Sequence, residues 1–140
     1  AFTAGDGLEE CKAQVQLQNL PVVFHPPLAN ISRILQAFDA ILMPSRWEGY
    51  GRVAAEGFLS GTPVIASDTH GLRETFPPQW PLKVPADDSV ALSDLLIDVL
   101  EGRRDLNALG ASAREWARPT FSVDREVDDY ETRYLRYLNR

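Results

Sequence analysis

Cysteine is almost absent from this sequence. Cys11 is the single cysteine, so no intramolecular disulfide can form and nothing in the cysteine content indicates an oxidising compartment. The formal net charge is −6, so the chain lacks the broad basic surface that nucleic-acid binding requires. No apolar run approaches the roughly 20 residues of a membrane span. We therefore expect neither a nucleic-acid partner nor a transmembrane segment.

The first residues also lack the pattern of a secretion signal. They carry neither a basic head nor a long apolar stretch, so we expect a cytoplasmic protein. The 140 residues suffice for one domain with its own core and are too few for two ordinary domains. Hydrophobic residues make up 44% and charged residues 24%, which is ordinary for a globular domain.

Short apolar segments alternate with helical patterns along the chain. We expect strands at residues 1–4, 22–24, 40–43, 64–66 and 82–84. We expect helices over residues 8–19, 31–38, 52–60, 72–75, 89–101, 104–116 and 122–138. The strands are short and unalternating, as strands are when helices cover both faces of their sheet. The pattern predicts an α/β fold, a Rossmann-like doubly wound parallel sheet with helices on both faces and a helical C-terminal tail.

The segment between the expected strand at residues 40–43 and the expected helix at residues 52–60 carries the most chemistry. In open α/β sheets, ligands bind outside the carboxyl ends of the strands, where this segment lies. Gly49 and Gly51 remove side chains where the backbone has to approach a ligand. Free backbone N–H groups and the dipole of the following helix favour a phosphate. The amides expected to face it are those of Gly49, Tyr50, Gly51, Arg52 and Val53.

Two glutamates lie in this segment with seven residues between them, Glu48 and Glu56. Glu56 lies about one turn into the expected helix, with its side chain leaning toward the helix N-terminus. A carboxylate there can accept two hydrogen bonds from a vicinal diol such as a ribose, each worth about 1.5–3 kcal/mol. Glu48, on the loop, is placed to accept hydrogen bonds from the hydroxyls of a sugar. The alternative is that Arg52 and Glu56, four residues apart, form only a weak surface ion pair.

Residues 39–74 resemble the retaining glycosyltransferase group 1 family, which includes glycogen synthase and mannosyl- and glucosyltransferases of bacterial envelopes. The resemblance rests on linked motifs in the family's order, which are Asp39-Ala40, Pro44-Ser45-Arg46-Trp47-Glu48-Gly49-Tyr50-Gly51, Glu56, Gly61-Thr62-Pro63-Val64-Ile65-Ala66 and Gly71-Leu72-Arg73-Glu74. In that family two Rossmann-like domains face each other across a cleft, the GT-B fold. The C-terminal domain binds the nucleotide-sugar donor, and the N-terminal domain binds the acceptor.

The resemblance implies that residues 1–140 are part of the C-terminal, nucleotide-sugar-binding domain, without its first strand and without the N-terminal acceptor domain. The implied activity is transfer of a sugar from a nucleoside-diphosphate sugar to an acceptor hydroxyl, with retention of anomeric configuration. Glu48 is then the catalytic residue that contacts the donor sugar, and Glu56 binds the ribose. Sugar and diphosphate are held by the backbone of Gly49, Tyr50, Gly51, Arg52 and Val53. The isolated chain is expected to be inactive.

The resemblance also implies further contacts and partners. His70 and Gly71 would lie near the donor sugar, whereas Arg46 would either help to hold phosphate or be an ordinary surface arginine. Without an Asp-x-Asp motif, neither a metal nor another cofactor is expected. The expected partners are the nucleotide-sugar donor and an acceptor glycan, lipid or small molecule. The missing domain would hold that acceptor and would also mediate any association with a membrane.

Two details leave the assignment incomplete. Where the family has Phe-x-Gly close to the nucleotide base, this chain has Phe24-His25-Pro26, so the base contacts are open. Tyr130, Tyr134 and Tyr137 mark a helix face that packs either on this domain or on the absent one.

Three other protein classes are alternatives to this interpretation. The main alternative is a non-catalytic nucleotide-sugar-binding or interaction module of the same fold. An upstream pair of basic residues and an acceptor domain would distinguish an enzyme from it. An epimerase or phosphorylase of the same architecture is a second alternative. A phosphorylase needs a lysine for pyridoxal phosphate, and Lys12 and Lys83, the only lysines, lie outside the motif. A flavodoxin-like signalling domain would need acidic residues clustered at strand ends, which the sequence lacks.

Overall fold

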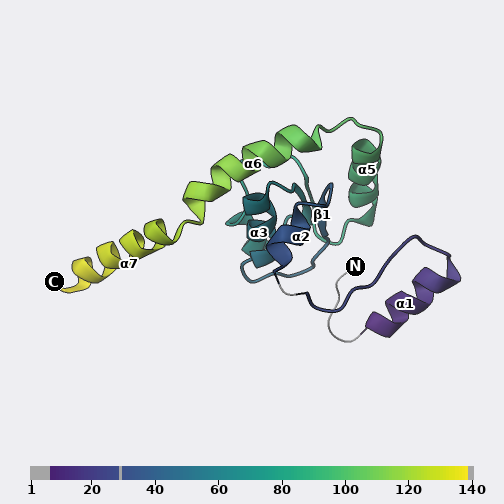
Figure 1. The fold of residues 1–140 in the computed structure, drawn as a ribbon, viewed down its shortest axis with the longest axis horizontal. Coiled ribbons are helices and arrows are strands. Elements are labelled where there is room, and N and C mark those ends of the chain that lie inside the picture. Colours follow the sequence, from purple (N-terminus) through teal and green to yellow (C-terminus); the bar gives the residue numbers. More distant parts are fainter. Residues whose placement is uncertain (1–6, 29, 139–140) are drawn as a thin grey trace. The chain divides into compact units, whose positions relative to one another are not determined.

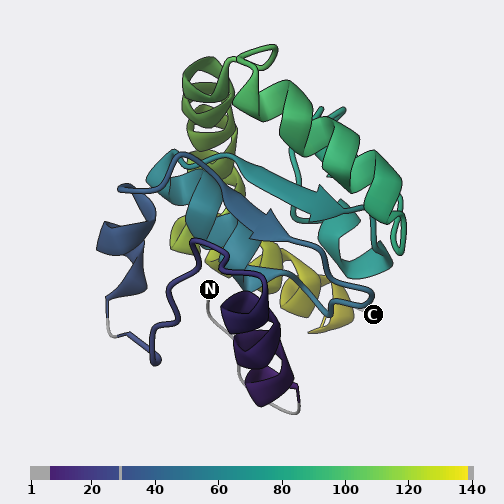
Figure 2. The ribbon, with the colours of Figure 1, turned by 90° about the vertical axis from the view of Figure 1, so that its right-hand side faces the viewer.

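Three parallel strands form the sheet of the computed structural model, which describes residues 7–28 and 30–138. These are β1 (Ile41–Met43), β2 (Val64–Ser67) and β3 (Lys83–Val84), side by side in that order. Ile41 lies opposite Val64, and Ala66 lies opposite Lys83. The arrows of β1 and β2 point the same way in Figure 2. The parallel sheet confirms the predicted α/β fold class.

Helices precede, connect and follow the strands (Figure 1). The helices of the described residues are α1 (Leu8–Leu17), α2 (Ile31–Leu35), α3 (Arg52–Ser60), α4 (His70–Arg73), α5 (Ser89–Leu100), α6 (Leu106–Thr120) and α7 (Val123–Leu138). The chain divides into two compact units, residues 1–31 and residues 32–140. The second unit holds the sheet, and α6 and α7 form its helical C-terminal tail, as the sequence predicted.

Helix α3 lies against β1 and β2 and forms the centre of the core. Its bounds are those that the sequence predicted, and Gly61 ends it with φ at 81°, a left-handed conformation that glycine adopts without steric cost. Ala54 and Phe58 are fully buried on its inner face. At Gly57 an added Cβ would lie 2.6 Å from Ile41 Cδ1, so the absence of a side chain lets α3 pack directly onto the sheet.

Aromatic rings surround Phe58. Its ring lies 5.1 Å from that of Phe76, 5.0 Å from Trp80 and 6.2 Å from Trp116, all in edge-to-face arrangements. Such pairs add about 0.5–1.5 kcal/mol each beyond the burial of apolar area. The Trp80 indole N–H donates to the carbonyl of Val64 at 2.7 Å, so this polar group is satisfied in the core. The cluster therefore joins α3, β2, α6 and the segment before β3.

Helix α6 packs along α3 through small residues. Ala113 and Ala117 are fully buried, and an added Cβ on Gly110 would lie 2.2 Å from the carbonyl oxygen of Gly61. The predicted end near Trp116 is wrong, because α6 runs through Pro119 to Thr120. A proline in the last turn removes one helical hydrogen bond but does not stop the helix there.

The first unit departs from the prediction at one segment. Helix α1 is present, but residues 22–24 form no strand, and Val23 is 65% exposed, so the predicted buried strand is wrong. A three-residue segment is stable as a strand only when it pairs with a neighbour, and the strands of the described sheet are β1, β2 and β3. The strand predicted at residues 1–4 lies outside the described residues.

An ion-pair cluster closes the C-terminal end of α5. Arg103 donates to the Asp98 carboxylate at 2.8 Å, and Arg104 lies 3.3 Å from its other oxygen. The hydrogen bond from Arg103 holds the pKa of Asp98 below its ordinary value of 3.8. Because the folded pKa is depressed, the stabilisation is present at neutral pH and is lost as the pH falls below that ordinary value.

We predict that Asp98→Asn lowers the free energy of unfolding at pH 7 and has a smaller effect at pH 3, which lies below the ordinary pKa of Asp98, because protonation of Asp98 in the unfolded state then removes part of the stabilisation. Urea denaturation of the two proteins at both pH values measures the difference. An equal loss at pH 3 and pH 7 would show that the charge of Asp98 contributes nothing.

We predict that Phe58→Ala lowers the free energy of unfolding by about 3–5 kcal/mol, because it opens a cavity within the aromatic cluster. Leu59→Ala, at the next residue, is the matched control. The Leu59 side chain is 37% exposed, so its removal should lower the free energy of unfolding far less. Urea denaturation followed by circular dichroism measures both. Equal losses would contradict the central position of Phe58.

Candidate functional site

The loop of residues 44–51 leaves the carboxyl end of β1 and ends at the first residue of α3. The hydroxyl of Thr75, which is fully buried, donates to the carbonyl of Tyr50. This bond fixes the end of the loop to the segment after α4. The loop therefore occupies the sheet end at which the sequence placed a ligand.

Gly71 is in close contact with the middle of this loop. An added Cβ on Gly71 would lie 2.1 Å from the carbonyl oxygen of Glu48 and 2.2 Å from that of Gly49. Backbone therefore packs on backbone, and any side chain at residue 71 would push the loop away. Gly71 is therefore tightly packed within α4 against the loop, and its place near a sugar stays a prediction.

Gly51 shapes the start of α3. Its φ of 70° is left-handed, and an added Cβ would lie 2.3 Å from the Leu72 side chain, so only glycine fits here. The helix begins at Arg52, and the amides of Arg52 and Val53 have no acceptor within the helix. These donors and the helix dipole make this end of α3 suited to an anion.

The two glutamates lie in different surroundings. Glu48 is partly buried, and its carboxylate accepts a hydrogen bond from the Ser45 hydroxyl at 2.9 Å. Glu56 lies 3.9 Å from the guanidinium of Arg52, whose side chain is 85% exposed. An exposed pair of this kind contributes a few tenths of a kcal/mol, so Glu56 remains available to a ligand. The Arg52–Glu56 ion pair that the sequence offered as an alternative is thus present, and it does not exclude a binding role for Glu56.

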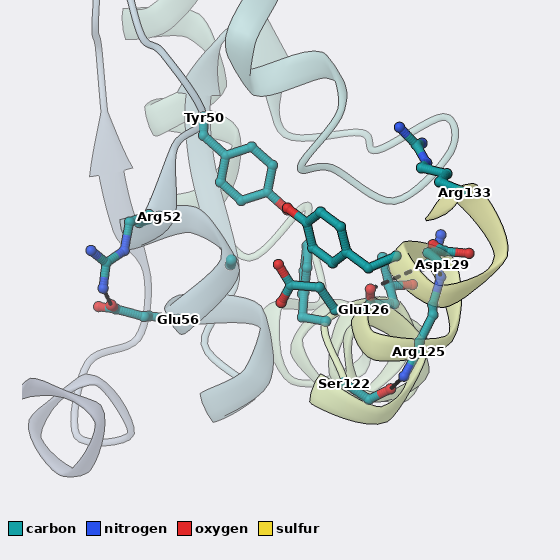
Figure 3. Close-up of a pocket in the computed structure, with 12 residues that line it drawn as sticks. Tyr50, Arg52, Glu56, Ser122, Arg125, Glu126, Asp129 and Arg133 are labelled. Atoms are coloured by element: carbon teal, nitrogen blue, oxygen red, sulfur yellow. Dashed lines mark hydrogen bonds and ion pairs between the residues drawn. The ribbon is translucent and has the colours of Figure 1, made fainter. Parts of the chain in front are cut away.

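An open cavity of about 510 Å³ adjoins Glu56 (Figure 3). We call it the α3–α7 cavity, because its walls come from the start of α3 and from the tail. Its lining residues are Tyr50, Arg52, Ala55, Glu56, Thr120, Phe121, Ser122, Arg125, Glu126, Asp129, Tyr130 and Arg133. Of the predicted site residues, the cavity brings together Tyr50, Arg52 and Glu56. Glu48, Gly49, Gly51 and Val53 do not line it.

Two further predicted residues lie at the rim of the sheet end. Arg46 donates to Asp87 at 2.6 Å, and its side chain is 85% exposed, which fits the alternative of an ion-paired surface arginine. His70 is exposed and begins α4. Neither residue lines the α3–α7 cavity.

The sequence interpretation missed the contribution of α7 to this cavity. Tyr130 lines it, whereas Tyr134, one turn further, does not, so the three tyrosines do not act as one packed face. They are 56%, 66% and 76% exposed in chain order, so none packs in the core. The helical spacing of Ser122, Glu126, Asp129 and Arg133 is the signal that could have revealed a shared face.

The described residues include neither a cluster of metal-ligating side chains nor a helix that could span a membrane. Within residues 7–28 and 30–138, no three His, Cys, Asp or Glu side chains come together in a way that would hold a metal ion. Over the same ranges, no helix has both the length and the apolar character needed to cross a membrane.

The sequence of this chain matches a known family over most of its length. Residues 2–102 match the model of the glycosyl transferases group 1. The match covers more than half of the chain, and the chain therefore belongs to this family. The family resemblance found in the motifs of residues 39–74 is confirmed.

Curated relatives and solved structures agree with this assignment. The 2-deoxystreptamine glucosyltransferase of Streptomyces kanamyceticus is 32% identical over 115 residues, which are 81% of this chain and 30% of the relative. The GDP-mannose-dependent monoacylated alpha-(1-6)-phosphatidylinositol monomannoside mannosyltransferase of Corynebacterium glutamicum is 33% identical over 112 residues, which are 71% of this chain and 29% of the relative. Sucrose-phosphate synthase of Thermosynechococcus elongatus superposes with a TM-score of 0.81 at 28% identity, covering 94% of this chain and 34% of that one. The chain spans about a third of the length of each of these three proteins.

We predict that Gly71→Ala displaces the loop and lowers the melting temperature, because its Cβ would overlap the Glu48 and Gly49 carbonyl oxygens. Gly49→Ala is the matched control, since its Cβ would meet nothing closer than the Trp47 ring at 4.0 Å. Amide chemical shifts of residues 48–50 and thermal unfolding measure the two effects. Similar behaviour of both variants would contradict the close packing at Gly71.

Proposed function

We propose that this chain is the donor-binding part of a retaining glycosyltransferase, with the acceptor bound by a further domain of a longer protein. It would transfer a sugar from a nucleoside-diphosphate sugar to an acceptor hydroxyl. Family membership and the names of the relatives support sugar transfer. The name of the Corynebacterium relative, which is GDP-mannose-dependent, supports a nucleoside-diphosphate sugar as the donor.

One observation carries this proposal: the loop of residues 44–51 carries Glu48 shortly before the N-terminus of α3, and α3 carries Glu56 about one turn after it. In the proposed complex, Glu56 accepts hydrogen bonds from the two ribose hydroxyls. The amides from Gly49 to Val53 hold the diphosphate, and Glu48 accepts hydrogen bonds from the donor sugar. The ligand then runs from Glu48 across the end of α3 to Glu56.

The proposed reaction breaks the bond between the anomeric carbon and the diphosphate oxygen, and the bonding electrons leave with the diphosphate. The acceptor oxygen attacks from the same face and gives its proton to the departing phosphate oxygen, which retains the configuration. Negative charge therefore builds up on the diphosphate, where the helix dipole and the amides of Arg52 and Val53 stabilise it. Glu48, held by Ser45, orients the sugar and favours the positive charge that develops on it.

The remaining site residues take supporting positions in this proposal. Gly71 holds the loop backbone that carries Glu48, and His70 is exposed beside it at the start of α4. Arg46 contributes to diphosphate binding only if it leaves Asp87. We propose that neither a metal nor another cofactor takes part, because the helix N-terminus provides the stabilisation of the leaving group that a metal would otherwise supply.

We predict that Glu56→Ala weakens the binding of nucleoside diphosphates by tenfold or more, equivalent to about 1.4 kcal/mol. Glu115→Ala, on the exposed side of α6, is the control and should leave the affinity unchanged. Titration of the chain with UDP, GDP and ADP and their glucose or mannose conjugates, followed by amide chemical shifts, measures the affinities.

Shifts centred on residues 49–53 and weakened by Glu56→Ala support the donor site. If none of these ligands shifts any amide at millimolar concentration, the titration is repeated on a form extended upstream, with the further residues of the longer protein. The absence of binding there as well would overturn the assignment.

A further inference from the structure

A second open cavity lies at the carboxyl ends of β2 and β3, and we call it the β2–β3 cavity. Its volume is about 490 Å³, and its lining residues all differ from those of the α3–α7 cavity. Asp68 follows the last residue of β2, and Pro85 follows the last residue of β3. Ligands of parallel α/β sheets bind at this end of the strands, and the proposed donor complex leaves this cavity unused.

Two cations and one carboxylate line the β2–β3 cavity. Arg73 of α4 donates through Nε to the Asp68 carboxylate at 3.0 Å. The ammonium of Lys83, on β3, lies 3.9 Å from the same carboxylate oxygen. Asp68 therefore balances only one of the two positive charges. A local positive excess in a chain whose net charge is −6 favours an anionic ligand at this position.

The charged groups are held in place rather than free in solvent. The amide of Asp68 donates to the carbonyl of Val84 at 2.7 Å, which fixes the segment after β2 to β3. The side chain of Lys83 is only 25% exposed, so its ammonium is held at the cavity. Arg73 uses Nε for Asp68, and its two terminal nitrogens remain as donors for a further acceptor. A guanidinium edge beside an ammonium matches the several oxygens of a phosphate group.

The rest of the cavity wall is apolar. It consists of Val84, Pro85 and Ala86, together with the edge of Trp80, whose residue is 6% exposed. A cavity of this volume suits a small organic molecule better than a bare ion. Membership of a sugar-transferring family favours a sugar as the carbon skeleton, since the C–H faces of a sugar ring pack on apolar surfaces.

We infer that the β2–β3 cavity binds the phosphate monoester of a small sugar. Arg73 and Lys83 contact the phosphate, and the wall around Pro85 packs on the sugar ring. The site goes beyond the proposed function and does not depend on it, because it shares no residue with the donor site formed by Glu48, Glu56 and the start of α3.

Titration of the chain with glucose 6-phosphate and mannose 6-phosphate, followed by amide chemical shifts, tests this site. The shifts should centre on residues 68, 73 and 83–86. Lys83→Gln and Arg73→Gln should each weaken binding by roughly tenfold, since each removes one phosphate contact. Lys83→Arg keeps the charge and should retain most of the affinity. Arg114→Gln removes the same charge from an exposed position of α6 outside the cavity, and it should leave the affinity unchanged.

Inorganic phosphate and glucose separate the two parts of the ligand. Both sugar phosphates should bind more tightly than inorganic phosphate, and glucose should cause no shift at these residues. Equal affinities for inorganic phosphate and the sugar phosphates would indicate an adventitious ion only and would overturn the inference. Shifts confined to residues 49–53 would place the phosphate at the start of α3 and would also overturn it, as would the absence of any shift at millimolar concentration.

The variants and the nucleotide titration keep the result interpretable. Circular dichroism and thermal unfolding check that each variant is folded. If Lys83→Gln is not folded, the comparison of Arg73→Gln with Arg114→Gln decides, and equal affinities of these two variants would contradict the site. A chain that binds GDP or UDP but no sugar phosphate would retain the proposed function and lose this inference. Binding of sugar phosphates without any nucleotide would give the opposite result.

Discussion

The contact between Gly71 and the carbonyl oxygens of Glu48 and Gly49 is the constraint on which the candidate site depends. It joins the loop after β1 to the segment after β2 by backbone alone, at a separation that no side chain tolerates. The hydrogen bond from Thr75 to the Tyr50 carbonyl adds a second attachment, one residue after Gly49 in the loop and four residues after Gly71 in the other segment. Glu48 therefore projects from a loop that is fixed at two points, rather than from a free surface loop.

The core keeps α3 in place beneath that loop. Phe58 lies among three aromatic rings, two from the segment before β3 and one from α6. Gly57 and Gly110 let α3 approach the sheet on one side and α6 on the other. Glu56 belongs to the same helix, two residues before Phe58. The position of the Glu56 carboxylate, for which we propose a role in ligand binding, is thus set by apolar packing on the opposite side of one short helix. A rigid element can hold a binding group precisely in this way.

The sequence predicted the strands and helices of the second unit well, because their apolar periods and the glycine at residue 61 are local signals. The failures have physical causes. Residues 22–24 are apolar enough for a strand, but a strand needs a neighbour, which sequence alone does not supply. The loop of the candidate site was found from its glycines and glutamates. The contribution of α7 was missed because the cavity joins residues about 75 positions apart in the chain.

Helix α7 has no buried residues and follows directly on the end of α6. Its first residues follow Phe121, whose ring packs 5.4 Å from Trp116 at the end of α6, and its own side chains are exposed along its whole length. A helix of 16 residues spans about 24 Å. A rotation of roughly 10° about Phe121 would therefore move its far end by about 4 Å, while α3 and the sheet stay still. Such a rotation would change the distance between α7 and α3, and with it the width of the cavity beside Glu56.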